Sequence, residues 1–217
     1  MGALQNPFTS LQGLEQAIGH LRTKDKTLAR LIRRVGPCRL CTDNRRSPFE
    51  SLVEAVAHQQ LHGKAARTIL GRVKALVPNR RFPSPDDLLH LPEDSLRGAG
   101  LSRAKVAAVK DIAAKTRDRI VPTARQMAHM DDAEIVERLT TIRGVGRWTV
   151  EMLLIFKLGR LDVLPIDDFG VRKGFAITYR HEDLPRPKAL LDYGERWRPF
   201  RSVAAWYLWR AVDESNQ

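Results

Sequence analysis

Cysteine is scarce in this 217-residue chain, which holds only two, Cys38 and Cys41. Their C-x-x-C spacing is compatible with half of a zinc site or with a redox pair. A zinc site needs two more ligands, and the chain has no second cysteine pair. A thioredoxin-like motif needs a βαβ context, which the surrounding sequence lacks. We therefore expect two ordinary reduced cysteines beside a loop.

Long apolar runs and a leader-like start are also missing. No apolar stretch approaches the roughly 20 residues that a membrane-spanning helix needs. The first residues, MGALQNPFTSLQG, lack the basic-then-apolar pattern of a signal peptide. From the sequence we expect a cytoplasmic protein that does not enter a membrane.

Acidic residues are too few to balance the basic ones. The chain has 25 Asp and Glu against 37 Lys and Arg, so its formal net charge is +12. Such an excess favours a polyanionic partner, either nucleic acid or an anionic membrane surface. The alternative is a basic surface that serves only solubility.

The alternating pattern of β-strands is absent as well. Apolar residues instead recur at helical spacing along nearly the whole chain. Residues suited to helix starts precede several of these segments, including Asp25, Ser47 and Ser102. With 43% hydrophobic residues, the chain can bury a sizeable core in one domain or in two joined lobes. We predict an all-α fold of about ten short helices.

The stretch from Leu139 to Lys173 contains the most informative motif. An apolar helix ends at Gly144-Val145-Gly146, and a second helix begins at once with Arg147 and Trp148. We expect both glycines to adopt conformations that a Cβ would strain, or to approach a phosphate closely. The turn also presents unpaired amides at a helix start, where a phosphate can bind. An ordinary tight helix–helix turn is the alternative.

This hairpin, followed by a loop with Asp167 and Asp168, resembles the helix-hairpin-helix DNA glycosylase superfamily. FESLVEAVAHQQLHGKAA, from Phe49, and ERWRPFRSVAAWYLWR, from Glu195, are similar to its alkylbase branch, 3-methyladenine DNA glycosylase II. The resemblance covers most of the chain and implies two helical lobes with a DNA-binding cleft between them. The central lobe would span residues 49–161, and residues 1–48 and 162–217 would form the second. We expect the compact form, without the N-terminal β domain of the bacterial type member.

The resemblance implies that Asp168 is the catalytic residue. Cleavage of a glycosidic bond passes through an oxocarbenium-like sugar, which a carboxylate stabilises while it orients or deprotonates the attacking water. We expect Asp167 to cap the following helix. The alternative is that both aspartates only cap.

Trp148 stands where bifunctional members of the superfamily carry a lysine that acts as a Schiff-base nucleophile. The resemblance therefore implies a monofunctional enzyme that leaves an abasic site without cutting the strand. It also places Trp148 in the substrate-base pocket, where an indole face attracts a cationic alkylated purine. A tryptophan buried in the core is the alternative.

The resemblance implies that DNA is held by the hairpin and by a segment that fills the gap left by a flipped base. The DNA contacts that we expect come from Gln59, Gln60, Leu61, His62, Lys64, Arg143, Gly144, Val145, Gly146 and Arg147. Which residue of Gln59 to Leu61 inserts is left open. Arg201 is a further candidate phosphate neighbour. For each of Lys64, Arg143, Arg147 and Arg201, a solvated surface charge is the alternative. Trp206, Tyr207 and Trp209 fit a core stripe.

No iron–sulfur cluster is expected, because that branch needs four C-terminal cysteines and none follows Cys41. From the resemblance we expect at most a structural sodium ion at the hairpin, on the backbone carbonyls of Thr140, Ile142 and Val145. The expected partner is double-stranded DNA containing alkylated bases, bound by a monomer in the nucleoid.

We therefore predict a monofunctional DNA glycosylase that hydrolyses the N-glycosidic bond of alkylated purines in base-excision repair. One alternative is a non-catalytic helix-hairpin-helix DNA-binding protein, for which the carboxylate of Asp168 would only repel phosphates. Another is a glycosylase for oxidised or mismatched bases, against which the absent lysine and cluster argue.

Overall fold

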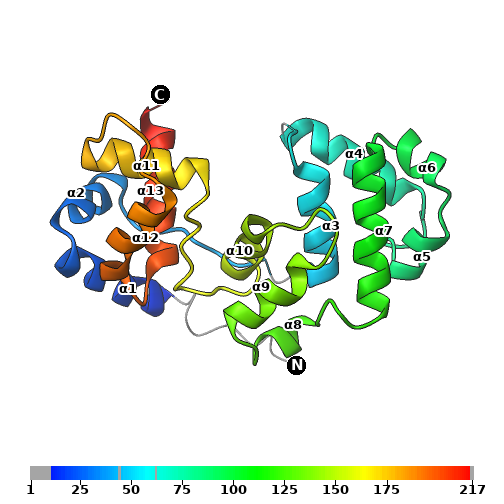
Figure 1. Ribbon diagram of the computed structural model, residues 1–217, viewed down its shortest axis with the longest axis horizontal. Coiled ribbons are helices and arrows are strands. Elements are labelled where there is room, and N and C mark those ends of the chain that lie inside the picture. Colours follow the sequence, from blue (N-terminus) through cyan, green and yellow to red (C-terminus); the bar gives the residue numbers. More distant parts are fainter. Residues whose placement is uncertain (1–10, 44, 62, 216–217) are drawn as a thin grey trace. The chain divides into compact units, whose positions relative to one another are not determined.

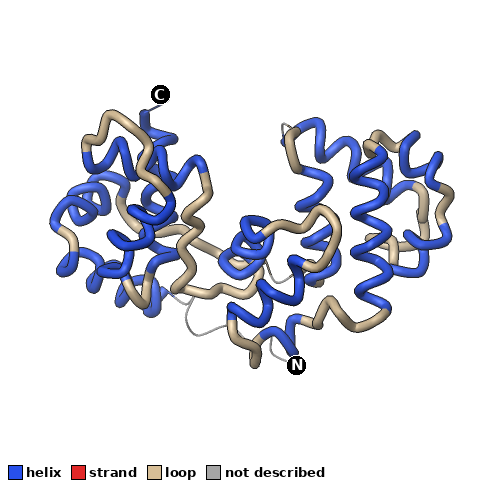
Figure 2. Tube along the Cα trace, in the orientation of Figure 1, coloured by secondary structure: helices blue, strands red, loops and turns tan. Residues whose placement is uncertain are grey.

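The computed structural model describes residues 11–43, 45–61 and 63–215, and this part of the chain is helical without any strand (Figure 2). The predicted all-α fold is thus confirmed. Within the same ranges, no helix is both long and apolar enough to cross a membrane.

The described residues fall into two compact units. Residues up to Thr42 and from Leu154 onward form the first, here called the terminal unit, and Asp43–Leu153 form the second, the central unit. The central unit contains α3 (Pro48–His58), α4 (Gly63–Ala75), α5 (Pro85–His90), α6 (Glu93–Gly98), α7 (Arg103–Arg117), α8 (Ala124–Met127), α9 (Asp132–Thr140) and the start of α10 (Arg147–Phe156). The terminal unit contains α1 (Leu11–Lys24), α2 (Lys26–Val35), α11 (Phe169–Tyr179), α12 (Pro187–Gly194), the 3-10 helix η2 (Glu195–Trp197) and α13 (Arg201–Ser215).

Helix α7 is the organising helix of the central unit, where it packs against both α3 and α5 (Figure 1). Its side chains Val106, Val109 and Ile112 are at most 1% exposed. These residues recur at three-residue intervals, which places them on one side of the helix. Burial of this apolar side fixes α7 as a rigid support for the elements around it.

The pairing of α11 with α13 organises the terminal unit. A Cβ on Gly174 of α11 would lie 2.0 Å from the backbone oxygen of Leu208, so the two helix backbones come very close at this point. From Arg201 to Leu208, α13 is buried throughout. This close contact sets the position of α11, whose first turn follows Asp168.

The helix starts that we predicted from capping residues are confirmed. Ser47 and Glu50 form a reciprocal capping box at α3, and Ser102 accepts a hydrogen bond from the Lys105 amide at α7. Asp25 caps α2 by accepting from the amides of Thr27 and Leu28. Each cap satisfies amides that would lack a partner in the first turn of the helix.

Candidate functional site

The glycine turn joins α9 to α10 as the sequence predicts, but its two glycines differ. Gly144 has φ +77, and a Cβ there would lie 2.9 Å from the Cβ of Ala108 in α7. Gly146 has no positive φ, and a Cβ there would meet no described heavy atom within 4 Å. The expected strain is therefore confirmed at Gly144 and wrong at Gly146. A close approach to phosphate remains a prediction for Gly146.

The hairpin exposes its backbone and its arginines while it buries its central side chain. Val145 is 3% exposed, whereas Arg143, Gly146 and Arg147 are exposed. The Arg147 Nε donates to Glu151 Oε1 at 2.9 Å, one helical turn further on. The buried valine anchors a turn whose exposed side carries two glycines and two arginines.

Trp148 lies in the first turn of α10 and is 43% exposed. It is therefore not a core residue, and that alternative is wrong. Its side chain lines a pocket of about 490 Å³ within the central unit, together with His58, Gln59, Gln60, Lys105 and Met152. An aromatic face in a mostly apolar pocket suits the stacking of a planar ring.

The segment after α3 lies beside the hairpin. The side-chain Nε2 of Gln59 donates to the backbone oxygen of Gly144 at 2.9 Å. Gln60 adopts a left-handed conformation with φ +57, and Leu61 is 39% exposed. Lys64 is exposed at the start of α4, while His62 lies outside the described residues. We call Gln59, Gln60 and Leu61 the α3 turn. The apolar side chain of Leu61 is its exposed tip, and the backbone at Gln60 is strained.

Asp168 is the N-cap of α11, since its Oδ1 accepts from the Val171 amide at 2.7 Å. We predicted that Asp167 would take this role. That prediction is wrong, and Asp167 is exposed one residue earlier. The helix begins at Phe169, directly after Asp168, so the second aspartate has the geometry of a cap.

A second donor reaches the same oxygen from α13. The indole Nε1 of Trp209 donates to Asp168 Oδ1 at 2.8 Å, and its ring stacks on Phe156 with centroids 5.6 Å apart. The predicted core stripe is confirmed for Trp206 and Tyr207, which are 9% and 0% exposed, and wrong for the half-buried Trp209. Gly170 leaves room for this contact, because a Cβ at that position would lie 2.8 Å from Trp209 Cδ1. A glycine two residues after Asp168 was the only trace of it in the sequence around this aspartate.

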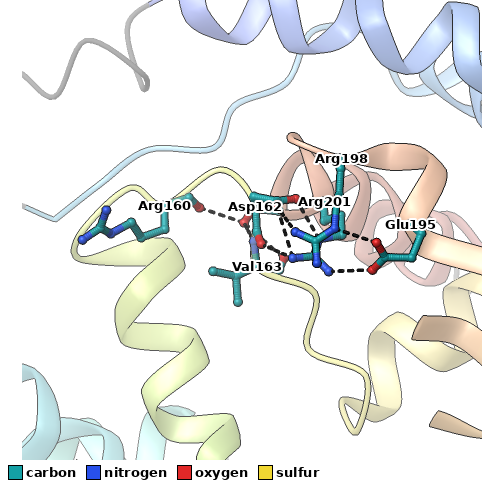
Figure 3. Close-up of polar contacts among 7 residues, drawn as sticks. Arg160, Asp162, Val163, Glu195, Arg198 and Arg201 are labelled. Atoms are coloured by element: carbon teal, nitrogen blue, oxygen red, sulfur yellow. Dashed lines mark hydrogen bonds and ion pairs between the residues drawn. The ribbon is translucent and has the colours of Figure 1, made fainter. Parts of the chain in front are cut away.

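The loop that leads to Asp168 is fastened to α13 by a cluster of charges (Figure 3). The Arg201 Nε donates to Asp162 Oδ1 at 2.7 Å, and its Nη2 donates to the Asp162 backbone oxygen at 2.8 Å. Arg198 bridges Asp162 and Glu195. Arg201 is only 9% exposed, so the alternative that it is a solvated surface charge is wrong, and a phosphate contact stays a prediction. A bidentate guanidinium pair of this kind fixes geometry as well as charge.

The two cysteines are free thiols. Cys41 is exposed, whereas burial raises the pKa of the Cys38 thiol to about 11. The described residues hold no cluster of three or more His, Cys, Asp or Glu side chains that could bind a metal ion. This part of the chain therefore gives no support to the zinc alternative.

Comparisons with known proteins agree with this geometry. Residues 53–199 match the HhH-GPD superfamily of base excision DNA repair proteins. DNA-3-methyladenine glycosylase 1 of Schizosaccharomyces pombe is 40% identical over 91% of this chain and 87% of its own length. A structure of the S. pombe 3-methyladenine DNA glycosylase with abasic DNA matches with a TM-score of 0.80, covering 90% of this chain and 95% of that one. A DNA-3-methyladenine glycosidase structure from Bacillus halodurans matches with a TM-score of 0.83 and 32% identity, covering 93% and 91% of the two chains. The chain belongs to the HhH-GPD superfamily of base excision DNA repair proteins.

Proposed function

We propose that this protein is a monofunctional DNA glycosylase that releases alkylated purines, such as 3-methyladenine and 7-methylguanine, from double-stranded DNA in base-excision repair. The relatives described above are named for 3-methyladenine, and the S. pombe structure contains DNA. The observation that carries the proposal is the carboxylate of Asp168, whose Oδ1 is held by the Val171 amide and the Trp209 indole. The nucleoid location predicted from the sequence goes with this substrate.

Asp168 is the residue to which we assign the chemistry. Departure of the base leaves positive charge on the sugar, and a carboxylate held in place stabilises that charge in the transition state. The same carboxylate orients the attacking water or accepts its proton. An alkylated purine that already carries a positive charge is a good leaving group, so the reaction needs no separate general acid.

Trp148 is the residue to which we assign recognition of the base. Its exposed indole lines the pocket of the central unit, and an electron-rich indole attracts a cation by about 1–2 kcal/mol when water is excluded. Since a tryptophan cannot form an imine with the sugar, strand cleavage by β-elimination is not expected from this position.

DNA is held through its phosphates by the amides and arginines of the hairpin, and the α3 turn fills the space left by the flipped base. The net charge of +12 supports this assignment. We propose a monomer on DNA, and a partly hydrated sodium ion on the carbonyls of Thr140, Ile142 and Val145. Carbonyl oxygens are suitable ligands for such a hard cation, and helix α9 ends at Thr140, where its last carbonyls lack intrahelical partners.

Replacement of Asp168 by Asn tests the catalytic role. We expect base release from a 7-methylguanine duplex to fall by about 10²–10³-fold, as when a charge-stabilising group is removed, while the duplex still binds. Asp167→Asn is the matched control, because it removes the adjacent exposed carboxylate and should keep nearly full activity. Single-turnover excision and a binding titration provide the measurements. Equal losses in the two variants would refute the role of Asp168.

Product analysis tests the reaction type and separates the rival functions. The wild-type protein should yield an intact abasic strand that breaks only after alkali, and borohydride should trap no protein–DNA adduct. Binding of DNA without release of any base would favour the non-catalytic alternative. Release of oxidised or mismatched bases in preference to alkylated purines would favour the other glycosylase class.

A further inference from the structure

One face of α7 contacts both elements that we assign to DNA binding. Lys105, Ala108, Asp111 and Lys115 recur every three or four residues and so lie along one side of the helix. We call these four residues the α7 stripe. Lys105 reaches the α3 turn, and the other three reach the hairpin.

Lys105 is bound to the end of α3. Its Nζ donates to the backbone oxygens of Ala57 and Gln59, both at 2.8 Å. Carbonyls in the last turn of a helix have no intrahelical partner and lie at the negative end of the helix dipole. An ammonium group that bonds one of them, on Ala57, together with the carbonyl of the cap residue Gln59, therefore fixes the place where α3 ends. Gln60 follows immediately in its left-handed conformation.

The remainder of the stripe holds the hairpin. Asp111 Oδ2 accepts from the Arg143 amide at 2.7 Å, and Lys115 donates to the Thr141 backbone oxygen. Ala108 lies against Gly144, at the point where a larger residue in the turn would collide. The turn amides and carbonyls are thus fixed from α7, independently of Lys105.

The two elements also meet directly, through the bond from the Gln59 side chain to the Gly144 oxygen. Gln59 is thus held from both sides, with its backbone oxygen on Lys105 and its side chain on the hairpin. Partial burial lowers the pKa of the Lys105 ammonium, and its two carbonyl acceptors compensate for the water that it has lost.

We propose that the α7 stripe sets the register between the phosphate-binding hairpin and the α3 turn, with Lys105 as the positioning residue that holds the turn ready to enter the base stack. This inference rests on the proposed function for the identity of the ligand. It implies that Lys105, although it lines the pocket beside Trp148, acts on base flipping through the α3 turn, because its ammonium is held by the carbonyls of Ala57 and Gln59.

Helix α7 itself provides a matched control. The Nζ of Lys110 donates to the backbone oxygens of Leu89 and Leu91 at 3.0 and 2.9 Å, which fixes the end of α5. Lys110 thus has the same chemistry on the same helix, but its two bonds go to the end of α5 instead of the α3 turn. Lys105→Met and Lys110→Met each remove an ammonium from two helix-end carbonyls and keep an unbranched side chain.

Hydrogen exchange of the free protein is the first measurement. Lys105→Met should accelerate exchange in peptides that cover Gln59 to Leu61, while hairpin peptides stay protected. Lys110→Met should accelerate exchange only around Leu91. Unchanged exchange at the α3 turn in Lys105→Met would overturn the inference, whatever reaction the protein catalyses.

Base flipping is the second measurement, followed by 2-aminopurine fluorescence next to an abasic-site analogue. Lys105→Met should reduce the flipping equilibrium about tenfold, the effect of losing one charge-assisted contact, and should bind undamaged duplex within twofold of wild type. Lys110→Met should match wild type in both assays. Equal flipping in the two variants, or an equal loss of duplex binding and flipping in Lys105→Met, would contradict the positioning role.

Base excision is the third measurement, and it keeps the two proposals apart. On duplex DNA, Lys105→Met should be about tenfold slower than Lys110→Met in single turnover, because fewer lesions are flipped. On a lesion in an unpaired bubble, where no stack must be opened, the difference should largely disappear. A wild-type protein that releases no base would refute the proposed function, and the exchange and fluorescence results would still decide the role of Lys105.

Discussion

Asp25 and Asp168 perform the same local task in very different surroundings. Both belong to the terminal unit, both cap a helix, and both accept a hydrogen bond from an indole, that of Trp197 or of Trp209. Asp25 is 5% exposed, whereas Asp168 is half-buried beside an exposed Asp167. The comparison shows that the two caps differ in access to the carboxylate, which is closed off at Asp25 and open at the residue to which we assign the reaction.

The hydrogen-bond partners of Asp25 shield its carboxylate from solvent. Its Oδ1 accepts from two backbone amides, and its Oδ2 accepts from the hydroxyls of Tyr179 and Tyr193 at 2.6 and 3.2 Å as well as from Trp197 Nε1 at 3.0 Å. Burial by itself raises the pKa of this carboxyl, but these hydrogen bonds together outweigh it and hold the pKa below its usual value. A carboxylate so fully engaged cannot face a substrate.

Helix α11 connects the two aspartates. Asp168 caps its N-terminus, and Tyr179, the last residue of the helix, donates to Asp25. Asp25 therefore helps to hold the helix whose N-terminus is capped by the more accessible Asp168. If this division of roles is right, a change at Asp25 should affect stability, and a change at Asp168 should affect activity.

The largest effect on stability is expected from Asp25→Asn. The amide puts N–H groups among three side-chain donors and removes a buried charge that they stabilise, so we expect a loss of about 3 kcal/mol in the free energy of unfolding. Activity per folded molecule should stay within threefold of wild type. Chemical denaturation followed by active-site titration measures both quantities.

Asp168→Asn is the reciprocal control for that prediction. It weakens one half-buried helix cap and should cost about 1 kcal/mol or less, because asparagine is also a good N-cap residue. Similar stability losses at the two aspartates would break the comparison. The comparison would also fail if Asp25→Asn lost more excision activity than the unfolded fraction of the protein accounts for.

A smaller effect, on activity, is expected from Trp209→Phe. The change removes the indole N–H that bonds Asp168 while it keeps an aromatic ring for the stack on Phe156. Loss of one donor to the carboxylate should slow single-turnover excision about tenfold, or about 1.4 kcal/mol. Trp206→Phe is the matched control one helical turn earlier. If both variants were equally slow, the Trp209–Asp168 bond would have no role in orientation.

The contrast also shows how far the sequence could lead. Asp25, Ser47 and Ser102 were recognisable as helix caps because capping depends on a few neighbouring residues. The choice between Asp167 and Asp168 as the cap depended on a one-residue difference in where α11 begins, which propensity does not resolve. The exposed Trp148 could be placed only through the resemblance.

Contacts between segments far apart in the chain could not be predicted from the sequence for a different reason. Trp209 and Asp168 are 41 residues apart, and Lys105 meets Gln59 across 46 residues. The sequence is compatible with Arg201 as a surface cation, but in the structure Asp162, 39 residues away, binds it. Helical periodicity shows which face of a helix is apolar, but it does not show which partner a polar side chain will meet.

The smallest effect concerns pH and distinguishes Asp25 from the other carboxylates. Because its pKa is lowered in the folded state, Asp25 adds stability that is fully present above the unfolded pKa near 3.8 and is lost as pH falls through the folded value. The stability difference between wild type and Asp25→Asn should therefore stay constant from pH 7 to about pH 5 and shrink below pH 3.8. Asp87, Asp111 and Glu195 also have lowered pKa values, so the wild-type curve alone cannot isolate Asp25. Urea titrations of both proteins across this range give the difference directly, and a difference that widens at low pH would show that the aromatic donors do not stabilise the charged form.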